Sequence, residues 1–267
     1  MKATSLPVST SALPGSPTLR SFFVHAFRDA SAYGDLILSA IRSLPRLRCP
    51  PVRMVCYKQV YFTGMEAVFP VAIAGLLVGL AVITQMSSVL GSGVQVNVRV
   101  IIVFVVRELA ILITALIVLA RSGSAMTSEL ASMKQRGEIK ALYAMGIDPS
   151  DYLLMPRIVG AVLSLFVLTF YFQFMAILGG MAFASVTSDF SFARYLTVFF
   201  TSLNWVDVCA SMLKSLLFGA IIATVCCHHG IYAPPAATLI PRSTENAMIR
   251  CFGLIFGLDA LCAVLLT

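Results

Sequence analysis

The sequence predicts an all-α integral membrane protein with about five transmembrane helices and an amphipathic helix at the membrane surface near the N-terminus. Two observations carry this prediction. Of the 267 residues, 59% are hydrophobic and only 12% are charged, which is about half the charged fraction of a soluble domain. The chain also contains several apolar stretches of roughly 20 residues, the length that a helix needs to cross the hydrocarbon core.

Five stretches meet this length requirement. They cover approximately residues 67–90, 98–120, 152–186, 206–227 and 247–266. The third is longer than the core is thick, so we expect it to tilt or to extend past the bilayer. The mean hydropathy of +0.92 agrees with a chain that lies mostly in lipid.

The N-terminal part differs in composition. Residues 1–19 are rich in Ser, Thr and Pro and are expected to form a flexible tail, with an organelle transit peptide as the alternative. Residues 20–50 alternate apolar clusters with arginines, which predicts an interfacial amphipathic helix or, alternatively, an ordinary cytoplasmic helix. We expect Pro45, Pro50 and Pro51 to end it.

The distribution of basic residues predicts the orientation. Lys and Arg gather before the first span, between the second and third, and between the fourth and fifth, whereas the opposite loops hold only Arg99 and Arg194. By the positive-inside rule the N-terminus is cytoplasmic and the C-terminus is outside.

Several functions are disfavoured by the sequence. The net charge of +7 is scattered rather than gathered in one patch, so no nucleic-acid partner is predicted. The chain lacks a phosphate-binding loop, H-E-x-x-H and G-x-S-x-G, so we predict no catalytic residues and no cofactor. The seven cysteines include no C-x-x-C, and we predict no metal site. His228 and His229 are expected to be solvated at the end of the fourth span.

The most informative polar stretch is residues 124–146. Its apolar residues recur at helical spacing, with a break at Gly137, and charged residues occupy the other face. A short amphipathic helix of this kind either docks in a groove on a partner or lies on the lipid surface. Periodicity alone leaves both interpretations open.

Short motifs follow one another in a fixed order along residues 55–267. They are Arg107-Glu108-Leu109, Gly123-Ser124-Ala125, Glu129-Leu130, Glu138-Ile139, Met145-Gly146-Ile147-Asp148-Pro149, Tyr152-Leu153, Pro156-Arg157, Ile177-Leu178-Gly179-Gly180 and Lys214-Ser215. In these motifs the chain resembles the MlaE/YrbE family of ABC-transporter permeases, which partner MCE proteins. Residues 55–267 would then form the permease domain.

The resemblance implies a non-catalytic homodimeric permease that pairs with two copies of an ABC ATPase and lies beneath a ring of MCE-domain proteins. Such a permease moves phospholipid or a related lipid between the bacterial inner membrane and the cell envelope, with an organelle envelope as the alternative location. It also implies that residues 124–148 hold the coupling helix that contacts the ATPase. The coupling candidates are Glu129, Met133, Arg136, Glu138, Leu142, Gly146, Asp148 and Pro149.

Four charged residues fall inside the predicted spans. Arg107 and Glu108 are placed near the middle of the second, Lys214 about nine residues into the fourth, and Asp259 near the middle of the fifth. Charge at such depth is costly unless it is paired or hydrated. The four residues either form ion pairs that lock the bundle or line a cavity that receives a lipid headgroup, and we retain them as lipid-pathway candidates.

Two glycine pairs, Gly75 with Gly79 and Gly253 with Gly257, have the spacing that permits close helix contact. A dimer seam near the first and fifth helices is one hypothesis from this spacing. Two other classes of function remain open, a membrane-embedded lipid-modifying enzyme and a structural membrane scaffold. The enzyme would need a nucleophile, a base and an acid at one depth, and the sequence shows no such set.

Overall fold

The computed structural model describes residues 33–34, 50–90, 101–146, 148–187, 197, 201 and 204–265. All the regular elements in these ranges are helices, so the predicted all-α class is confirmed. Five of the described helices are long and apolar enough to cross a membrane. They cover Arg53–Gln85, Val105–Gln135, Tyr152–Ala182, Trp205–Ile231 and Ala237–Val264.

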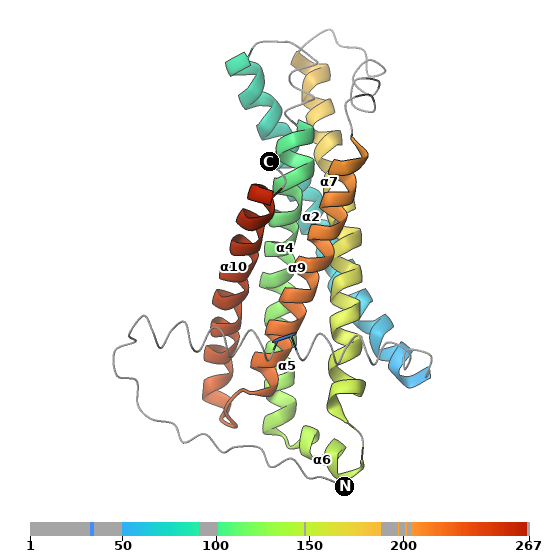
Figure 1. Cartoon of the computed structure of the whole chain (residues 1–267), viewed down its shortest axis with the longest axis vertical. Helices are drawn as coiled ribbons and strands as arrows, with labels where there is room; N and C mark the ends of the chain where they lie inside the picture. Colours follow the sequence, from blue (N-terminus) through green and yellow to red (C-terminus); the bar gives the residue numbers. More distant parts are fainter. Residues whose placement is uncertain are drawn as a thin grey trace, which may run out of the picture.

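The spans run alternately up and down the bundle (Figure 1). The first is α2 (Pro50–Leu90). The second joins the π-helix η2 (Ile101–Leu109), α4 (Ala110–Val118), the π-helix η3 (Leu119–Gly123) and α5 (Ser124–Gln135). After the short α6 (Glu138–Ala144), η4 (Ser150–Leu154) leads into α7 (Met155–Thr187). The last two are α9 (Trp205–Ile231) and α10 (Ile240–Leu265), which follows the 3₁₀ turn η5 (Ala237–Leu239).

The helix that contains the first span begins before the apolar stretch that starts near residue 67, and Pro50 and Pro51 form its first turn. The preceding helix that these prolines were expected to end lies outside the described residues. Proline is tolerated there because the first turn of a helix leaves its N–H groups unpaired and proline fixes a helical φ. The predicted tail over 1–19 lies outside the described residues. So does the interfacial helix over 20–50, apart from Tyr33 and Gly34, which are helical, and Pro50.

Glycines bring α2 and α7 into close backbone contact. A Cβ added to Gly79 would lie 2.7 Å from the carbonyl carbon of Ala176 and would overlap its oxygen. A Cβ on Gly179 would similarly overlap the carbonyl oxygen of Leu76. Small residues allow this approach. The dimer-seam hypothesis is therefore wrong for Gly75 and Gly79, because this pair is used within the chain.

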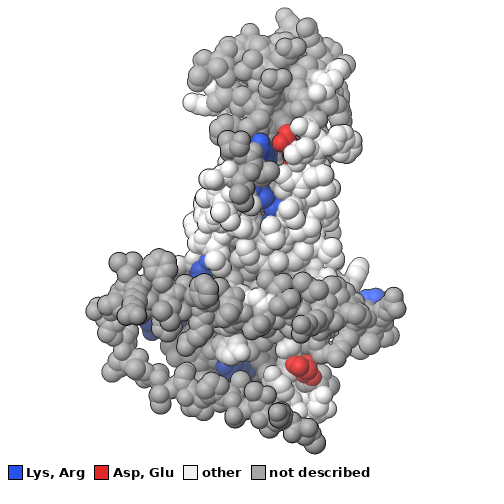
Figure 2. Space-filling model, viewed as in Figure 1, with Lys and Arg blue, Asp and Glu red and all other residues white. Residues whose placement is uncertain are grey.

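The core lies among the inner helices, and apolar surface faces outward. Phe172, Phe218, Ile111, Leu165 and Ile222 are fully buried. In contrast, the most apolar windows of α2 and α10 are only 28% and 17% buried. A helix that is apolar on its outer side is expected where lipid takes the place of water. On the face in Figure 2 the waist of the molecule is largely uncharged.

Residues 124–148 form two helices rather than one. The first, α5, continues the second span, and its Met126, Thr127 and Leu130 are buried. The Thr127 hydroxyl donates to the carbonyl of Cys226, at 3.2 Å, which ties α5 to α9. A left-handed Gly137 (φ 80°) then separates α5 from α6. Because the chain turns at Gly137, a single amphipathic helix over 124–148 is not formed, and α6 still packs against the core through Ile139 and Leu142.

Candidate functional site

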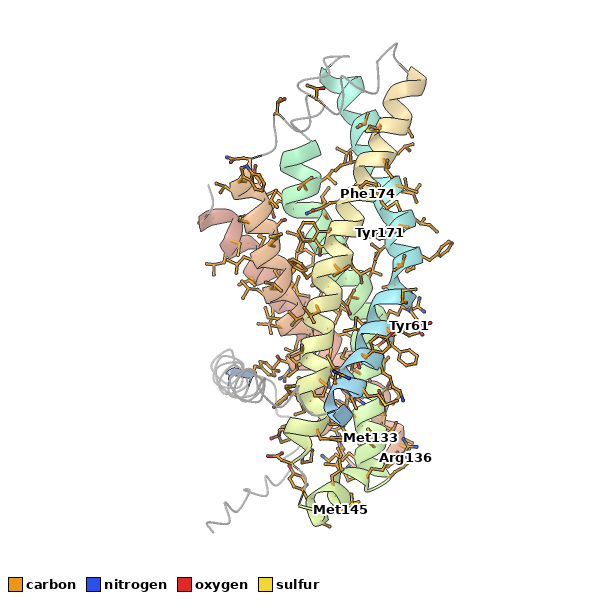
Figure 3. All side chains as sticks on the ribbon, turned by 90° about the vertical axis from the view of Figure 1, so that its right-hand side faces the viewer. Tyr61, Met133, Arg136, Met145, Tyr171 and Phe174 are labelled. Carbon is orange, nitrogen blue, oxygen red and sulfur yellow. The ribbon has the colours of Figure 1, made fainter. Side chains whose placement is uncertain are left out.

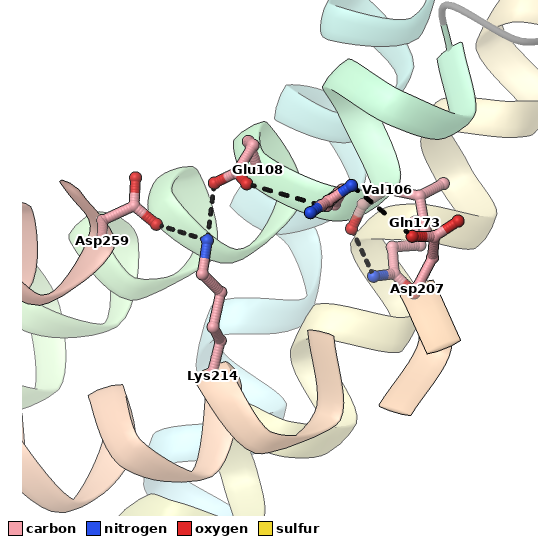
Figure 4. Close-up of polar contacts among 7 residues, drawn as sticks. Val106, Glu108, Gln173, Asp207, Lys214 and Asp259 are labelled. Carbon is pink, nitrogen blue, oxygen red and sulfur yellow. Dashed lines mark hydrogen bonds and ion pairs between the residues drawn. The ribbon is translucent and has the colours of Figure 1, made fainter. Parts of the chain in front are cut away.

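Lys214 of α9 joins three helices through two carboxylates. Its Nζ donates to Glu108 Oε2 at 2.6 Å and to Asp259 Oδ1 at 2.9 Å (Figure 4). The Lys214 residue is only 2% exposed. A charge buried to this degree needs opposite charges and hydrogen bonds to offset its lost hydration. These ion pairs are one of the two alternatives that the sequence left open, and they link the second, fourth and fifth spans.

Arg107 extends the cluster toward α9. Its Nε lies 4.0 Å from Glu108 Oε1, and its Nη1 lies 3.8 Å from Asp207 Oδ1. Both distances are long for ion pairs, and the Arg107 and Glu108 side chains are 26% and 28% exposed. The sequence analysis missed Asp207. Its signal was the seven-residue spacing from Lys214, which places both residues on one helix face.

An amide from α7 supports the start of the second span. Gln173 Nε2 donates to the Val106 carbonyl at 3.0 Å and lies 3.4 Å from Ser211 Oγ. Val106 belongs to the π-helical segment η2, where the ordinary α-helical pairing of carbonyls is interrupted. Gln173 therefore satisfies a buried carbonyl directly beside Arg107 and Glu108. Sequence reasoning did not select this residue.

The helix that carries Arg107 and Glu108 begins at Ile101 and continues through α5 to Gln135 in the described residues. Both residues therefore lie nearer its start than its end. Their depth near the middle of a span over about 98–120 stays a prediction. A second layer of charge, which includes Arg121 and Arg157, lies toward the other end. The layers at Glu108 and Arg121 are about 20 Å apart along the helix.

The coupling candidates divide into two groups. The first group is held by the rest of the chain: Met133 and Leu142 pack against the core, and Pro149 is buried. Glu129 belongs to it as well, since its Oε1 accepts a hydrogen bond from Arg157 Nη2 at 3.0 Å. Gly146 has φ 75°, and Asp148 Oδ1 accepts from the Ser150 amide at 2.9 Å. These residues shape the turn into η4 and α7.

The remaining candidates, Arg136 and Glu138, are exposed or half-buried and pair with each other at 3.0 Å. Nearby Tyr143 and Met145 are 63% and 64% exposed. Met133, Arg136 and Met145 lie at the same end of the bundle in Figure 3. Partial burial, with lesser effects from Asp148 and Tyr232, raises the pKa of the Tyr143 phenol, which stays neutral near pH 7.

Within the described ranges, no group of three or more His, Cys, Asp or Glu side chains is arranged to hold a metal ion. What the described residues offer is an amine between two carboxylates, a neighbouring guanidinium and a supporting amide. This arrangement can hold helices together or meet a charged headgroup.

Five apolar spans with ion pairs between them define a multi-pass α-helical membrane protein. The family described as permease MlaE matches residues 56–265, which include almost all of α2 through α10. The chain belongs to this permease family.

Relatives agree with this assignment. A probable ABC transporter permease of Rickettsia prowazekii is 26% identical over 229 residues, covering 85% of this chain and 88% of the relative. The intermembrane phospholipid transport system permease protein MlaE of Haemophilus influenzae is 24% identical over 241 residues, covering 87% and 90%. The chloroplastic protein trigalactosyldiacylglycerol 1 of Arabidopsis thaliana is 33% identical over 158 residues, covering 57% and 44%.

Proposed function

We propose that this chain is the membrane-spanning, non-catalytic subunit of an ATP-driven transporter that moves phospholipid or a related lipid between the inner membrane and the cell envelope. The observation that carries the proposal is the permease family match over residues 56–265, which takes in all five spans. The Haemophilus influenzae relative is named for intermembrane phospholipid transport.

The ATPase would dock on the end of the bundle that carries α6. Here Tyr143 and Met145 expose most of their apolar surface beside the charged pair Arg136 and Glu138. Aromatic and methionine side chains are enriched in the cores of protein interfaces. Because α5 is packed into the bundle and connects to α6 through Gly137, movement of α6 would be transmitted to the second span. With positive residues inside, this end is cytoplasmic.

The charged cluster would act in two ways. Lys214 is nearly inaccessible and serves as the lock between three spans. The side chains of Arg107 and Glu108 are 26% and 28% exposed, so these are the two members of the cluster that would meet a zwitterionic or anionic headgroup. Charge reversal at Glu108 tests this role. Normal transport by a correctly folded Glu108→Lys variant would show that Glu108 has no role in the lipid pathway.

A homodimer would form through α10. An added Cβ on Gly253 or Gly257 would have no heavy atom within 4 Å, apart from the adjacent residues and the backbone of its own helix. Phe252 and Phe256 are exposed on the same helix. A second copy could therefore approach α10 closely, as α7 approaches α2. Two copies of the permease would take two copies of the ATPase, and an MCE-domain protein would sit on the opposite membrane face.

Purification of the tagged chain from its native membranes tests the proposal. We expect an ABC ATPase to co-purify and its ATP hydrolysis to rise when phospholipid is added. Tyr143→Ala and Met145→Ala should each lower ATPase recovery about tenfold, the usual effect of losing an interface anchor of about 1.4 kcal/mol. The control is Trp205→Ala, which truncates an exposed side chain at the first residue of α9.

The two rival functions give different results in the same experiment. A lipid-modifying enzyme would change the phospholipid chemically in the absence of nucleotide. A structural scaffold would retain envelope proteins without any ATPase. Either result would overturn the transporter proposal.

A further inference from the structure

A groove lies at the end of the bundle opposite the Lys214 cluster. It has a volume of about 400 Å³ and is formed by the first part of α2, the junction of η3 with α5, and the start of α7. The basic residues Lys58, Arg121 and Arg157 line it, together with Glu66 and Glu129. None of these three basic residues is within the Lys214 cluster, so the groove is a separate site.

Only one of the two terminal nitrogens of the Arg157 guanidinium has a hydrogen-bond acceptor among the described residues. The Arg157 residue is 6% exposed. Its Nη2 donates to Glu129 Oε1 at 3.0 Å, whereas its Nη1 is buried and has no hydrogen-bond acceptor among the described residues. A buried donor of this kind is costly unless an acceptor reaches it. Because Arg157 lines the groove, an acceptor that binds there can meet this guanidinium.

The charge of the groove favours an anion. Glu66 pairs with Arg121 at 3.0 Å, and Glu129 pairs with Arg157 at the same distance. These two pairs cancel in charge, and Lys58 on the exposed rim leaves the lining with one excess positive charge. A phosphate offers several acceptor oxygens and matches a guanidinium closely.

Apolar surface continues from the groove along the first span. Phe62 lines the groove and is 57% exposed, and Phe69, about two turns further on, is 73% exposed. Leu77 and Leu80 extend the exposed apolar surface past the middle of α2. Beyond Glu66 the span carries no charge through Gln85. The groove thus opens where the charged end of the bundle meets the surface that faces hydrocarbon.

We propose that this groove binds the phosphate of an anionic phospholipid at the membrane surface on the α6 side, with its acyl chains along the exposed face of α2. Arg157 Nη1 donates to a phosphate oxygen, and Lys58 supplies the second positive charge. The inference rests on the proposed lipid transport only for the choice of a lipid over free phosphate, since both carry the same acceptor group.

Native mass spectrometry of the purified chain, without the ATPase, measures this binding. Phosphatidylglycerol is added to the detergent-solubilised protein, with phosphatidylcholine as the zwitterionic comparison. We expect selective retention of phosphatidylglycerol. Arg157→Gln should lower its affinity about tenfold, as expected for the loss of one charge-assisted hydrogen bond. Lys58→Gln should lower it severalfold.

The matched control is Arg242→Gln, which removes the same charge from an exposed side chain outside the groove. Its affinity for phosphatidylglycerol should equal that of the wild type. If Arg157→Gln fails to fold, Lys58→Gln decides the question, because Lys58 is exposed. Unchanged affinity in Lys58→Gln and in any folded Arg157→Gln variant would overturn the site.

Two further measurements distinguish the phospholipid from other ligands of the groove. Displacement of the lipid by inorganic phosphate alone, at equal affinity, would overturn the lipid as the ligand. Loss of ATPase recovery in Arg157→Gln with unchanged lipid affinity would overturn the site in favour of an acidic side chain of the partner. Selective phosphatidylglycerol binding without any ATPase-driven transport would uphold the groove and refute the proposed function by itself.

Discussion

Replacing Gly79 with alanine tests the helix contact on which the bundle depends. The new Cβ would meet the Ala176 carbonyl group, with 2.7 Å to its carbon, where ordinary contact requires 3.4–4 Å. Backbone atoms cannot rotate away, so α2 and α7 must separate by roughly 1 Å. A gap of about 0.5–1 Å already removes a quarter to a half of the dispersion energy of each facing atom pair.

The expected magnitude follows from two opposing terms. Overpacking costs about 1–3 kcal/mol, and contact with backbone favours the upper end. Alanine returns about 1 kcal/mol of helix propensity relative to glycine. The net loss is about 2 kcal/mol, which for a chain of this size lowers Tm by about 4–8 °C.

A thiol-reactive fluorophore measures this change in detergent, because Cys226, Cys227 and Cys251 are buried and become reactive when the bundle opens. Gly64→Ala on the same helix is the matched control, since an added Cβ there meets only the Ser164 hydroxyl oxygen at 3.7 Å, an ordinary contact. Its Tm should stay the same or rise. Equal Tm values for Gly79→Ala and the wild type would refute the close packing of α2 on α7.

Three further predictions concern the polar groups. Lys214→Met leaves the Glu108 and Asp259 carboxylates without their shared cation and should destabilise the fold by about 3–5 kcal/mol. Thermal unfolding should show that the lost stability is recovered when Glu108→Gln and Asp259→Asn are combined with Lys214→Met. Gln173→Leu removes a donor to a buried carbonyl and should cost about 1–3 kcal/mol, measured in the same way. The pKa of Tyr143 is raised, so its phenolate should form only at a pH above the ordinary tyrosine pKa of about 10. The difference in phenolate absorbance between the wild type and Tyr143→Phe, followed against pH, measures this.

Hydropathy and motif order were sufficient for the fold class and the five spans, but not for the helix ends. The helix that contains the first span begins at Pro50, before the apolar stretch that starts near residue 67, and its early part packs against α7. Gln59, for example, lies beside Gly160 of α7. A segment with moderate hydropathy can thus continue a membrane helix when a neighbour covers it.

The charged site was only partly predictable. Glu108, Lys214 and Asp259 were selected because charge in an apolar span requires a partner. Asp207 and Gln173 were missed, since each lies in a position that local sequence explains equally well, in the first turn of a helix or as a single amide in a long apolar run. The groove around Arg157 was also missed because its residues come from three separate helices.

By itself, the sequence determined that the chain crosses a membrane several times and that its intramembrane charges must be neutralised. These are properties of each segment, because transfer free energy depends on the residues that a helix carries. Only the tertiary structure decided which groups meet. Glu108 and Lys214 are 106 positions apart in the chain, and Gly75 and Gly79 contact α7 rather than a second copy. Such pairings depend on distances between helices, which close packing sets and local composition does not encode.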